Sequence, residues 1–344
     1  MRSFWPASVS AFVALLALDA SNVGSSSVVS LQLPAGASIV RADGNVVAAV
    51  VPGNRKGRCA EIFLWRVGGD RKKLKTIVEC DNDGVGLDGV DDLAVGGRTV
   101  LWEETNGGNN LELSISKATL ARPKEQEVSY VENGDGAAGD PAGDWTGSLV
   151  GHGSLLAYAS WTECDRAGGG YARTCSSGGH DLYAQRLHLV GGRRVVHFGP
   201  DAIFPVWTDG HAILILHEDR TLVLVDPHGR AFWRHSAVPG LVGAVFQGSQ
   251  LVALTRNRLF VWRLPGLTPV RSFPLTRAKR VLEDLDGGVA VLGSSGTTHL
   301  IRLSDGRGAT FTHAAHAQLE PQGLTFASGA SLRFLPRSQI RFGG

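Results

Sequence analysis

The sequence predicts an all-β protein assembled from seven copies of one four-stranded unit. Short runs of Val, Leu and Ile alternate with polar residues, and no long stretch shows helical spacing. Gly is abundant, at 45 of 344 residues, as expected for a chain with many tight turns. The plainest copy runs from Leu241 to Thr276. Its expected strands and turns are residues 242–246, 250–255, 258–263 and 269–275, joined at Gln247-Gly248, Arg256-Asn257 and Pro265-Gly266.

The first turn of this unit recurs seven times, each time between two short apolar strands. The last glycines of the seven turns are Gly44, Gly97, Gly153, Gly210, Gly248, Gly288 and Gly329. Their spacings are 53, 56, 57, 38, 40 and 41 residues. Repeats of about 40–45 residues with four strands each are typical of β-propellers. We therefore expect a β-propeller whose first three repeats carry insertions.

The unit fits the remaining copies in chain order. The expected strands are 39–41, 46–51, 61–67 and 73–79; then 90–95, 99–104, 111–118 and 125–131; then 145–150, 155–161, 181–189 and 194–198; then 203–207, 212–217, 221–226 and 231–235; and, in the sixth copy, 280–283, 289–292, 298–303 and 309–312. The seventh copy offers only 323–326, 331–335 and 339–342. An additional strand, from Val28 to Leu33, precedes the first copy. Because an open ring would expose strand edges, we expect this strand to complete the last blade of a seven-bladed β-propeller of four-stranded blades.

Two segments resemble repeats of known propeller families. The run RLFVWRLPGLTPVRSFPL is similar to the ending of a WD-repeat-type blade. The run TLVLVDPHGRAFWRH resembles a quinoprotein-type repeat, in which a D-x-x-G-x-x-x-W pattern closes a blade, here as Asp226, Gly229 and Trp233. The chain thus resembles the broad WD-repeat-like or quinoprotein-like β-propeller superfamily, in an exported form. Such a resemblance implies a fold and no particular activity.

The N-terminus is expected to direct export. An apolar run of signal-peptide length, residues 11–18, follows Arg2 and precedes the small residue Ala20, and it is too short to span a bilayer. We expect a signal peptide over residues 1–20, a flexible mature N-terminus over 21–27 and a single propeller domain over 28–344. The expected location is extracytoplasmic: secreted, periplasmic or associated with the cell wall. A retained N-terminal anchor or a disordered tail is the alternative.

The four cysteines agree with export. Cys164 and Cys175 flank a Gly-rich loop and are expected to form one disulfide, which leaves Cys59 to pair with Cys80. Four cysteines allow three pairings, and the sequence leaves that choice open. Four free thiols in a cytosolic protein are the alternative. A zinc site is not favoured, because no C-x-x-C motif or clustered Cys and His spacing is present.

The insertions are expected to lie at one end of the ring. In a four-stranded blade, the connection between the second and third strands leaves at the same end as the connection to the next blade. The long connections all belong to these two classes, at 52–60, 80–89, 105–110, 132–144 and 162–180. Long loops on a rigid scaffold are where binding residues concentrate. Neutral drift of surface loops is the alternative, although it does not explain why all five lie at one end.

Charge is as uneven as loop length. From Cys80 to Asp165 there are 16 acidic and four basic residues, whereas the whole chain has a net charge of +2. The predicted binding face contains Asp81, Asp83, Asp88, Asp135, Asp140, Asp144, Glu163 and Asp165. This charge makes nucleic acid a poor partner and favours a cationic ligand, a basic protein surface or a divalent ion. Solvated loops kept soluble by their charge are the alternative.

One acidic loop has the beginning of a calcium motif. Asp81, Asp83 and Asp88 lie in a Gly-rich segment that starts like a D-x-D-G calcium loop but lacks the later Glu. Ca²⁺ is the one cofactor that the sequence suggests, and these residues are its candidate ligands. The alternative is a connection between blades in which Asp side chains cap turns.

No catalytic motif is present: there is no G-x-S-x-G, H-E-x-x-H or phosphate-binding G-x-x-x-x-G-K. The sequence therefore favours a non-catalytic, monomeric binding or scaffolding propeller for a protein or for a glycan or other cell-envelope ligand. The alternative is a propeller enzyme of the glycoside hydrolase or polysaccharide lyase type, with carboxylates around the central channel. Six tryptophans recur at comparable strand positions, where they are expected to pack between blades: Trp65, Trp102, Trp161, Trp207, Trp233 and Trp262.

Overall fold

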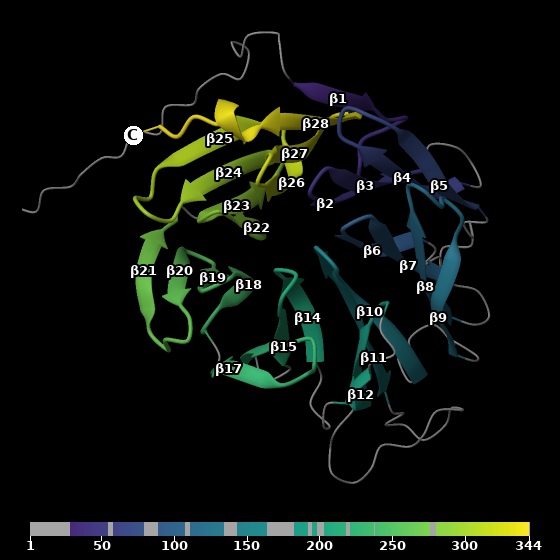
Figure 1. Cartoon of the computed structure of the whole chain (residues 1–344), viewed down its shortest axis with the longest axis horizontal. Helices are drawn as coiled ribbons and strands as arrows, with labels where there is room; N and C mark the ends of the chain where they lie inside the picture. Colours follow the sequence, from purple (N-terminus) through teal and green to yellow (C-terminus); the bar gives the residue numbers. More distant parts are fainter. Residues whose placement is uncertain are drawn as a thin grey trace, which may run out of the picture.

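The computed structural model forms a ring of seven four-stranded antiparallel sheets (Figure 1). It describes residues 28–53, 58–78, 89–106, 111–133, 143–163, 182–191, 195–197, 203–217, 221–236, 238–275 and 280–343. The expected fold class, an all-β seven-bladed propeller, is confirmed. Within these residues no helix combines the length and hydrophobicity that crossing a membrane would require.

The blades follow one another along the chain. Their strands are β2 (Ile39–Asp43), β3 (Val46–Pro52), β4 (Arg58–Arg66) and β5 (Arg71–Val78) in blade 1; β6 (Gly89–Gly96), β7 (Thr99–Asn106), β8 (Leu111–Thr119) and β9 (Gln126–Asn133) in blade 2; β10 (Gly143–His152), β11 (Leu155–Glu163), β12 (Leu182–Leu189) and β13 (Val195–His197) in blade 3; β14 (Ile203–Thr208), β15 (Ile213–His217), β16 (Leu222–Val225) and β17 (Ala231–His235) in blade 4; β18 (Leu241–Gln247), β19 (Gln250–Thr255), β20 (Arg258–Arg263) and β21 (Pro269–Pro274) in blade 5; and β22 (Val281–Asp286), β23 (Val289–Ser294), β24 (Thr297–Arg302) and β25 (Gly308–Thr312) in blade 6.

Blade 7 contains both ends of the described chain. It orders its strands as β1 (Val29–Gln32), β28 (Ser331–Pro336), β27 (Gly323–Ser328) and β26 (Ala315–Glu320). The pairing of β1 with β28 brings Leu31 opposite Leu332, so the prediction that the strand from Val28 to Leu33 closes the ring is confirmed.

The predicted alignment of the seventh repeat was wrong. Its innermost strand is β26, which was not predicted, and residues 339–342 form no strand. A short 3₁₀-helix covers Arg337–Gln339, and the residues that follow it are irregular. The turn at Ser328-Gly329 joins the second and third strands of the blade, whereas the first turn, at Pro321-Gln322, contains no glycine. Using glycine as the marker of the first turn therefore displaced the repeat by one strand.

The core lies between the blades. Seven clusters of buried apolar side chains are found among the described residues, and each cluster joins two neighbouring blades. The second strand of a blade is covered on both faces, so it reads as a continuous apolar run, as in β3, instead of an alternating one. The expected packing role of Trp holds for Trp65, Trp102, Trp233 and Trp262, which are buried. The propeller thus gains one core layer with each added blade.

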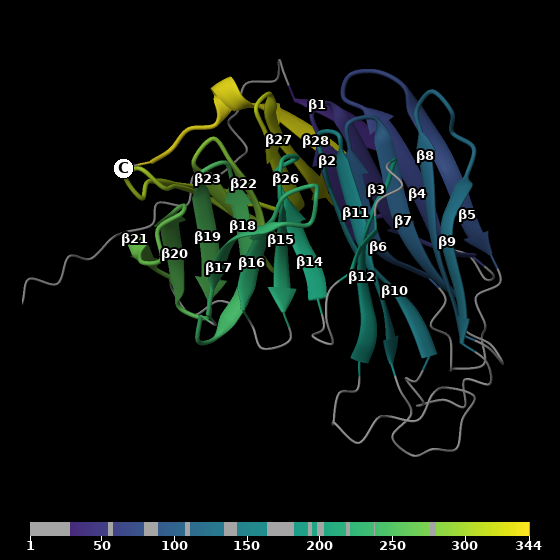
Figure 2. The same cartoon turned by 60° about the horizontal axis from the view of Figure 1, so that its bottom comes forward.

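The ring has two different ends. At the turn end, short turns join the first strand of each blade to the second. The opposite loop end holds the connections between the second and third strands and between blades. The strands of blades 1 to 3 are longer, with ten residues in β10 and nine in β11, against six in β14 and five in β15. Figure 2 shows these long strands beside the shorter strands of blades 4 and 5.

Candidate functional site

Most of the predicted acidic face falls outside the described residues. Asp81, Asp83, Asp88, Asp135, Asp140 and Asp165 lie there, and so does the side chain of Glu163. Asp144 is described: it lies exposed at the loop end of β10 and accepts a hydrogen bond of 2.6 Å from the Thr162 hydroxyl. The calcium site at Asp81, Asp83 and Asp88 therefore stays a prediction.

The predicted disulfides also involve residues outside the described part of the chain. Cys59, near the start of β4, is the one cysteine in the described part of the chain, and it is not a free thiol. Cys80, Cys164 and Cys175 lie outside the described residues. The pairings Cys59–Cys80 and Cys164–Cys175 therefore remain predictions.

Acidic side chains gather on the described strand ends beneath the predicted face. Glu112 of β8 lies directly opposite Glu132 of β9, and Asn106 donates a hydrogen bond of 3.4 Å to Glu112. Tyr130, 48% exposed, lies near them on β9, and partial desolvation together with the charges of Glu112 and Glu132 raises its pKa. We call Glu112, Tyr130, Glu132 and Asp144 the acidic rim. Like charges placed directly opposite on two strands are unfavourable, so this surface is suited to a cationic partner.

A second polar region lies at the centre of the ring. The innermost strands enclose a cavity of about 790 Å³ whose wall contains Val and Leu side chains as well as ionisable ones. The ionisable side chains of the wall are Arg41, Asp92, His152, Glu283, Asp284, His316 and Glu320. Arg41 lies 3.8 Å from Asp92. The wall of the channel is thus mixed, with both apolar and ionisable side chains.

Two of these carboxylates join neighbouring blades. Asp92 accepts hydrogen bonds from its own neighbour Leu93 and from Leu149 of blade 3, both at 2.8 Å. Asp284 repeats this arrangement in blade 6, since it accepts from Leu285 at 2.7 Å and from Leu319 of blade 7 at 2.6 Å. Each Asp lies beside a bulge in its innermost strand. Their oxygens satisfy buried backbone N–H groups, which is a structural role.

A second set of interblade bonds surrounds the turn end. Here a side chain near the end of one innermost strand accepts the backbone N–H of a glycine in the first turn of the next blade. The pairs are Asp43 with Gly97, Asp209 with Gly248, Gln247 with Gly287 and Glu320 with Gly44. The recurring glycines thus do more than permit a turn, because their N–H groups connect the blades.

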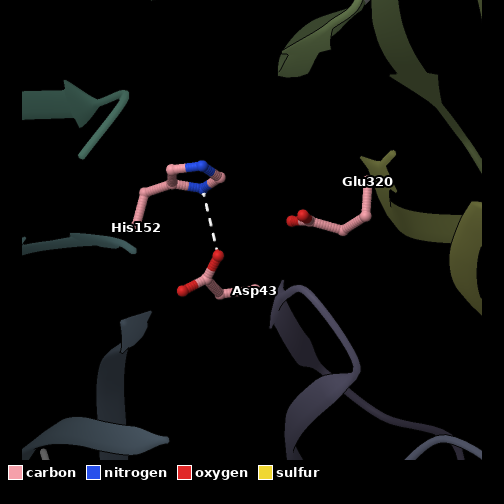
Figure 3. Close-up of side chains that lie close together, drawn as sticks. All are labelled: Asp43, His152 and Glu320. Atoms are coloured by element: carbon pink, nitrogen blue, oxygen red, sulfur yellow. Dashed lines mark ion pairs between the residues drawn. The ribbon is translucent and has the colours of Figure 1, made fainter. Parts of the chain in front are cut away.

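Three members of the turn end converge on one point. Asp43 of blade 1, His152 of blade 3 and Glu320 of blade 7 direct their side chains toward one another (Figure 3). One possible ligand atom from each lies within 4.8 Å of those from the other two, and His152 Nδ1 lies 3.4 Å from Asp43 Oδ1. We call these three residues the turn-end cluster.

Both carboxylates of the turn-end cluster are buried, with Glu320 only 4% exposed. Burial, followed by the charge of Asp284, raises the pKa of Glu320 to about 9. Asp43 Oδ2 accepts the N–H groups of Gly97 and of Gly153, the latter at 2.7 Å. The nearby guanidinium of Arg337 is bound to Asp286 and donates to the Glu320 carbonyl at 3.1 Å.

Sequence reasoning missed this cluster. Asp43 and His152 occupy the same position of the repeat, the last residue of an innermost strand. Aligning the repeats on that position would have placed them at the same end of the channel. Glu320 remained hidden because the seventh repeat was misaligned.

No known protein family matches the sequence, and no curated protein does either. Among solved structures, the chain is similar to the β-propeller domain of Cps50 (Swd1) from Myceliophteria thermophila. The TM-score is 0.52 and the identity 10%, over 90% of this chain and 99% of that one. It is also similar to the WD40 domain of Pan2 from Neurospora crassa, with a TM-score of 0.50 and 12% identity, over 92% of this chain and 98% of that one.

Raptor from Chaetomium thermophilum is also similar, with 12% identity and a TM-score of 0.49 over 90% of this chain. This chain spans 29% of the length of that protein. The likeness to the Swd1 and Pan2 domains supports the resemblance to WD-repeat propellers at the level of the fold. At such low identity it carries no activity or partner over to this chain.

Proposed function

We propose that the chain is an extracytoplasmic, non-catalytic binding propeller that holds a positively charged partner on the acidic face of blades 1 to 3. The observation that carries the proposal is the placement of Glu112 directly opposite Glu132 at the loop end of blade 2. A cationic partner would be attracted by the negative charge concentrated at these carboxylates. Tyr130 beside them offers an amphipathic contact of the kind enriched at protein interfaces.

Several features support a protein surface or a cell-envelope polymer as this partner. The residues of the acidic rim all lie within the segment from Cys80 to Asp165, in which acidic residues outnumber basic ones by 16 to four. Complementary charge at an interface accelerates association and selects the partner more than it adds affinity. The extended strands of blades 1 to 3 hold the rim on a rigid support, which limits the entropy lost on binding.

The proposal predicts that rim charge determines binding. A Lys- and Arg-rich peptide serves as the probe, and its affinity is measured by isothermal titration calorimetry at low and physiological salt. E112Q/E132Q is expected to bind about tenfold more weakly than the unaltered protein, a loss of about 1.4 kcal/mol, and with a smaller salt dependence.

The matched control is D70N/D305N, which changes the net charge equally on exposed turns at the opposite end of the ring. It is expected to bind the peptide like the unaltered protein. Equal weakening in both double variants would mean that only the overall charge matters, and the rim would not be the binding face.

Export is part of the proposal. It is supported by the apolar segment of residues 11–18 and by the finding that Cys59 is not a free thiol. We expect protein recovered from the medium or the cell envelope to begin near residue 21. The measurement is the intact mass of the purified protein, together with its N-terminal sequence. Recovery of the full-length chain from the cytosol would contradict this part of the proposal.

One observation favours a second function, hydrolysis or elimination on a polysaccharide. Carboxylates line the central cavity together with His152 and Arg41, and most glycoside hydrolases use a pair of carboxylates. Against it, Asp92 and Asp284 are engaged in bonds between blades. Release of soluble sugar from a panel of polysaccharides by the unaltered protein, lost in H152A, would favour the enzyme over the binding module.

A further inference from the structure

We propose that Asp43, His152 and Glu320 bind one divalent transition-metal ion, with Zn²⁺ as the best fit, at the turn end of the central cavity. This site lies at the opposite end of the ring from the acidic rim. It does not depend on the proposed function.

The donor set selects the class of ion. One imidazole nitrogen and two carboxylate oxygens suit Zn²⁺, which takes His, Asp and Glu ligands in a four-coordinate arrangement. Three protein ligands leave one position for water or another small ligand. Ca²⁺ requires six to eight oxygen ligands, and Mg²⁺ prefers octahedral oxygen coordination, so three side chains of this kind suit neither ion well.

The geometry is close to that of a zinc site. Bonds of about 2.0–2.1 Å in a tetrahedral arrangement separate neighbouring ligand atoms by about 3.4 Å. His152 Nδ1 and Asp43 Oδ1 are already 3.4 Å apart. The ligand atom of Glu320 lies within 4.8 Å of theirs, and its carboxylate points toward the other two side chains (Figure 3). Bringing this ligand atom from within 4.8 Å to about 3.4 Å of the other two requires it to approach each of them by at most about 1.4 Å.

Backbone groups hold the carboxylates in place. The N–H groups of Gly97 and Gly153 both donate to Asp43 Oδ2, so that Oδ1 is the oxygen that faces His152. The Gly44 N–H donates to the Glu320 carboxylate. Hydrogen bonds that orient the ligands of a metal ion in this way normally strengthen its binding.

Electrostatics also favour a cation here. Glu320 and Asp43 are 4% and 7% exposed, and the acidic side chains of Asp284 and Asp286 lie near Glu320. Arg337, the guanidinium beside this group, is bound to Asp286. A dication would compensate the charge that the two cluster carboxylates carry when they coordinate it. His152 is half-buried and lies on the cavity wall, so an ion can reach the site through the cavity.

The ion would also connect blades that meet where the ring closes. Asp43 belongs to blade 1, Glu320 to blade 7 and His152 to blade 3, so one ion joins the first and last blades to a third. Because an ion bound only by the folded ring stabilises it by mass action, zinc is expected to raise the Tm.

The experiment uses the full chain, treated with a chelator that is then removed. Calorimetric titration with ZnCl₂ is expected to show one ion per chain. At a free zinc concentration about 100 times the Kd, the Tm is expected to rise by roughly 5 °C. H152A and E320Q are expected to weaken zinc binding at least tenfold, and H211A, which removes an exposed histidine, is the control expected to bind normally.

E320Q alters a buried group, so circular dichroism must first show that this variant is folded. H152A replaces a half-buried side chain and keeps the test independent of that outcome. Absence of zinc binding by the unaltered protein, or equal affinity in H152A, would overturn the proposal. Binding of Ca²⁺ with an affinity equal to that of Zn²⁺ would overturn the assigned ion class.

Discussion

Deletion of residues 1–33 is expected to lower the Tm by roughly 10–20 °C relative to a chain that begins at Val28. The deletion removes β1 and with it the outer strand of blade 7. The ladder with β28, from Val29–Phe334 to Gln32–Ser331, would be lost, as would the 2.8 Å bond from the Leu33 N–H to the Ala330 carbonyl. The unpaired edge of blade 7 would then move from the four-residue β1 to the six-residue β28.

The size of this effect follows from burial and hydrogen bonding. Leu33 is 4% exposed and packs in the cluster between blades 7 and 1, and burying such a side chain contributes about 1.5–3 kcal/mol. Each backbone hydrogen bond of the ladder adds about 1 kcal/mol. The total is on the order of 5 kcal/mol, and a loss of 1 kcal/mol lowers the Tm of a protein of this size by about 2–4 °C.

Differential scanning calorimetry of the two truncated chains measures this effect. The chain that starts at Val28 keeps every described residue and is therefore the matched control. The shorter chain should also aggregate more readily on standing, because β28 would offer a longer free edge than β1 to other molecules. A Tm difference of less than about 3 °C would show that β1 contributes little to ring closure.

Raising the pH from 7 to 9 in the presence of a chelator is expected to lower the free energy of unfolding by on the order of 4 kcal/mol. Burial raises the pKa of Glu320 to about 9 and that of Glu103 to about 8, while an unfolded Glu titrates near 4.5. In this interval the folded state therefore binds more protons than the unfolded state, so stability falls as the pH rises. Each pKa unit corresponds to about 1.4 kcal/mol.

Other groups act outside this window. Burial raises the pKa of Asp284 to about 7, so its contribution is largely complete by neutral pH. Burial lowers the pKa of His188, His299 and His316, and for them the unfolded state binds more protons. Their contribution therefore raises stability with pH, but only up to the ordinary histidine pKa of about 6.5.

Urea denaturation at pH 7, 8 and 9 measures this dependence. E320Q is expected to remove more than half of the decline, because its amide does not ionise. E112Q, which alters a half-buried carboxylate of the rim outside the central cavity, is the control expected to leave the slope unchanged. Zinc should reduce the decline in the unaltered protein, since the ion favours the ionised carboxylate of Glu320. A slope that E320Q does not alter would mean that Glu320 is not the titrating group.

The repeat could be predicted from the sequence because the strands of each blade pair with their neighbours along the chain. Each blade is a meander of neighbouring strands whose turns lie within a few residues, so the apolar runs and the turn glycines predicted nearly every strand. Blade 7 was the exception, since Pro321-Gln322 carries the turn without glycine. Closure of the ring by the strand from Val28 to Leu33 was also predictable, because an incomplete last blade and an additional first strand require each other.

The acidic character of blades 1 to 3 was likewise a property of the sequence, as a count of charges from Cys80 to Asp165. Which carboxylates oppose each other was not predictable, because the pairing of Glu112 with Glu132 depends on the register of two strands. The cluster of Asp43, His152 and Glu320 was even less predictable from the sequence. Gly153, the partner of Asp43 next to His152, is 110 residues away along the chain.

The sequence by itself therefore determined the blade, the number of blades and the way the ring closes, because short-range periodicity and turn chemistry specify them. Only the tertiary structure decided which side chains meet at the centre. The curvature of the ring brings the ends of innermost strands from blades 1, 3 and 7 together, and burial then makes their carboxylates costly to ionise. That combination of convergence and burial is what makes the turn end of the channel a candidate metal site.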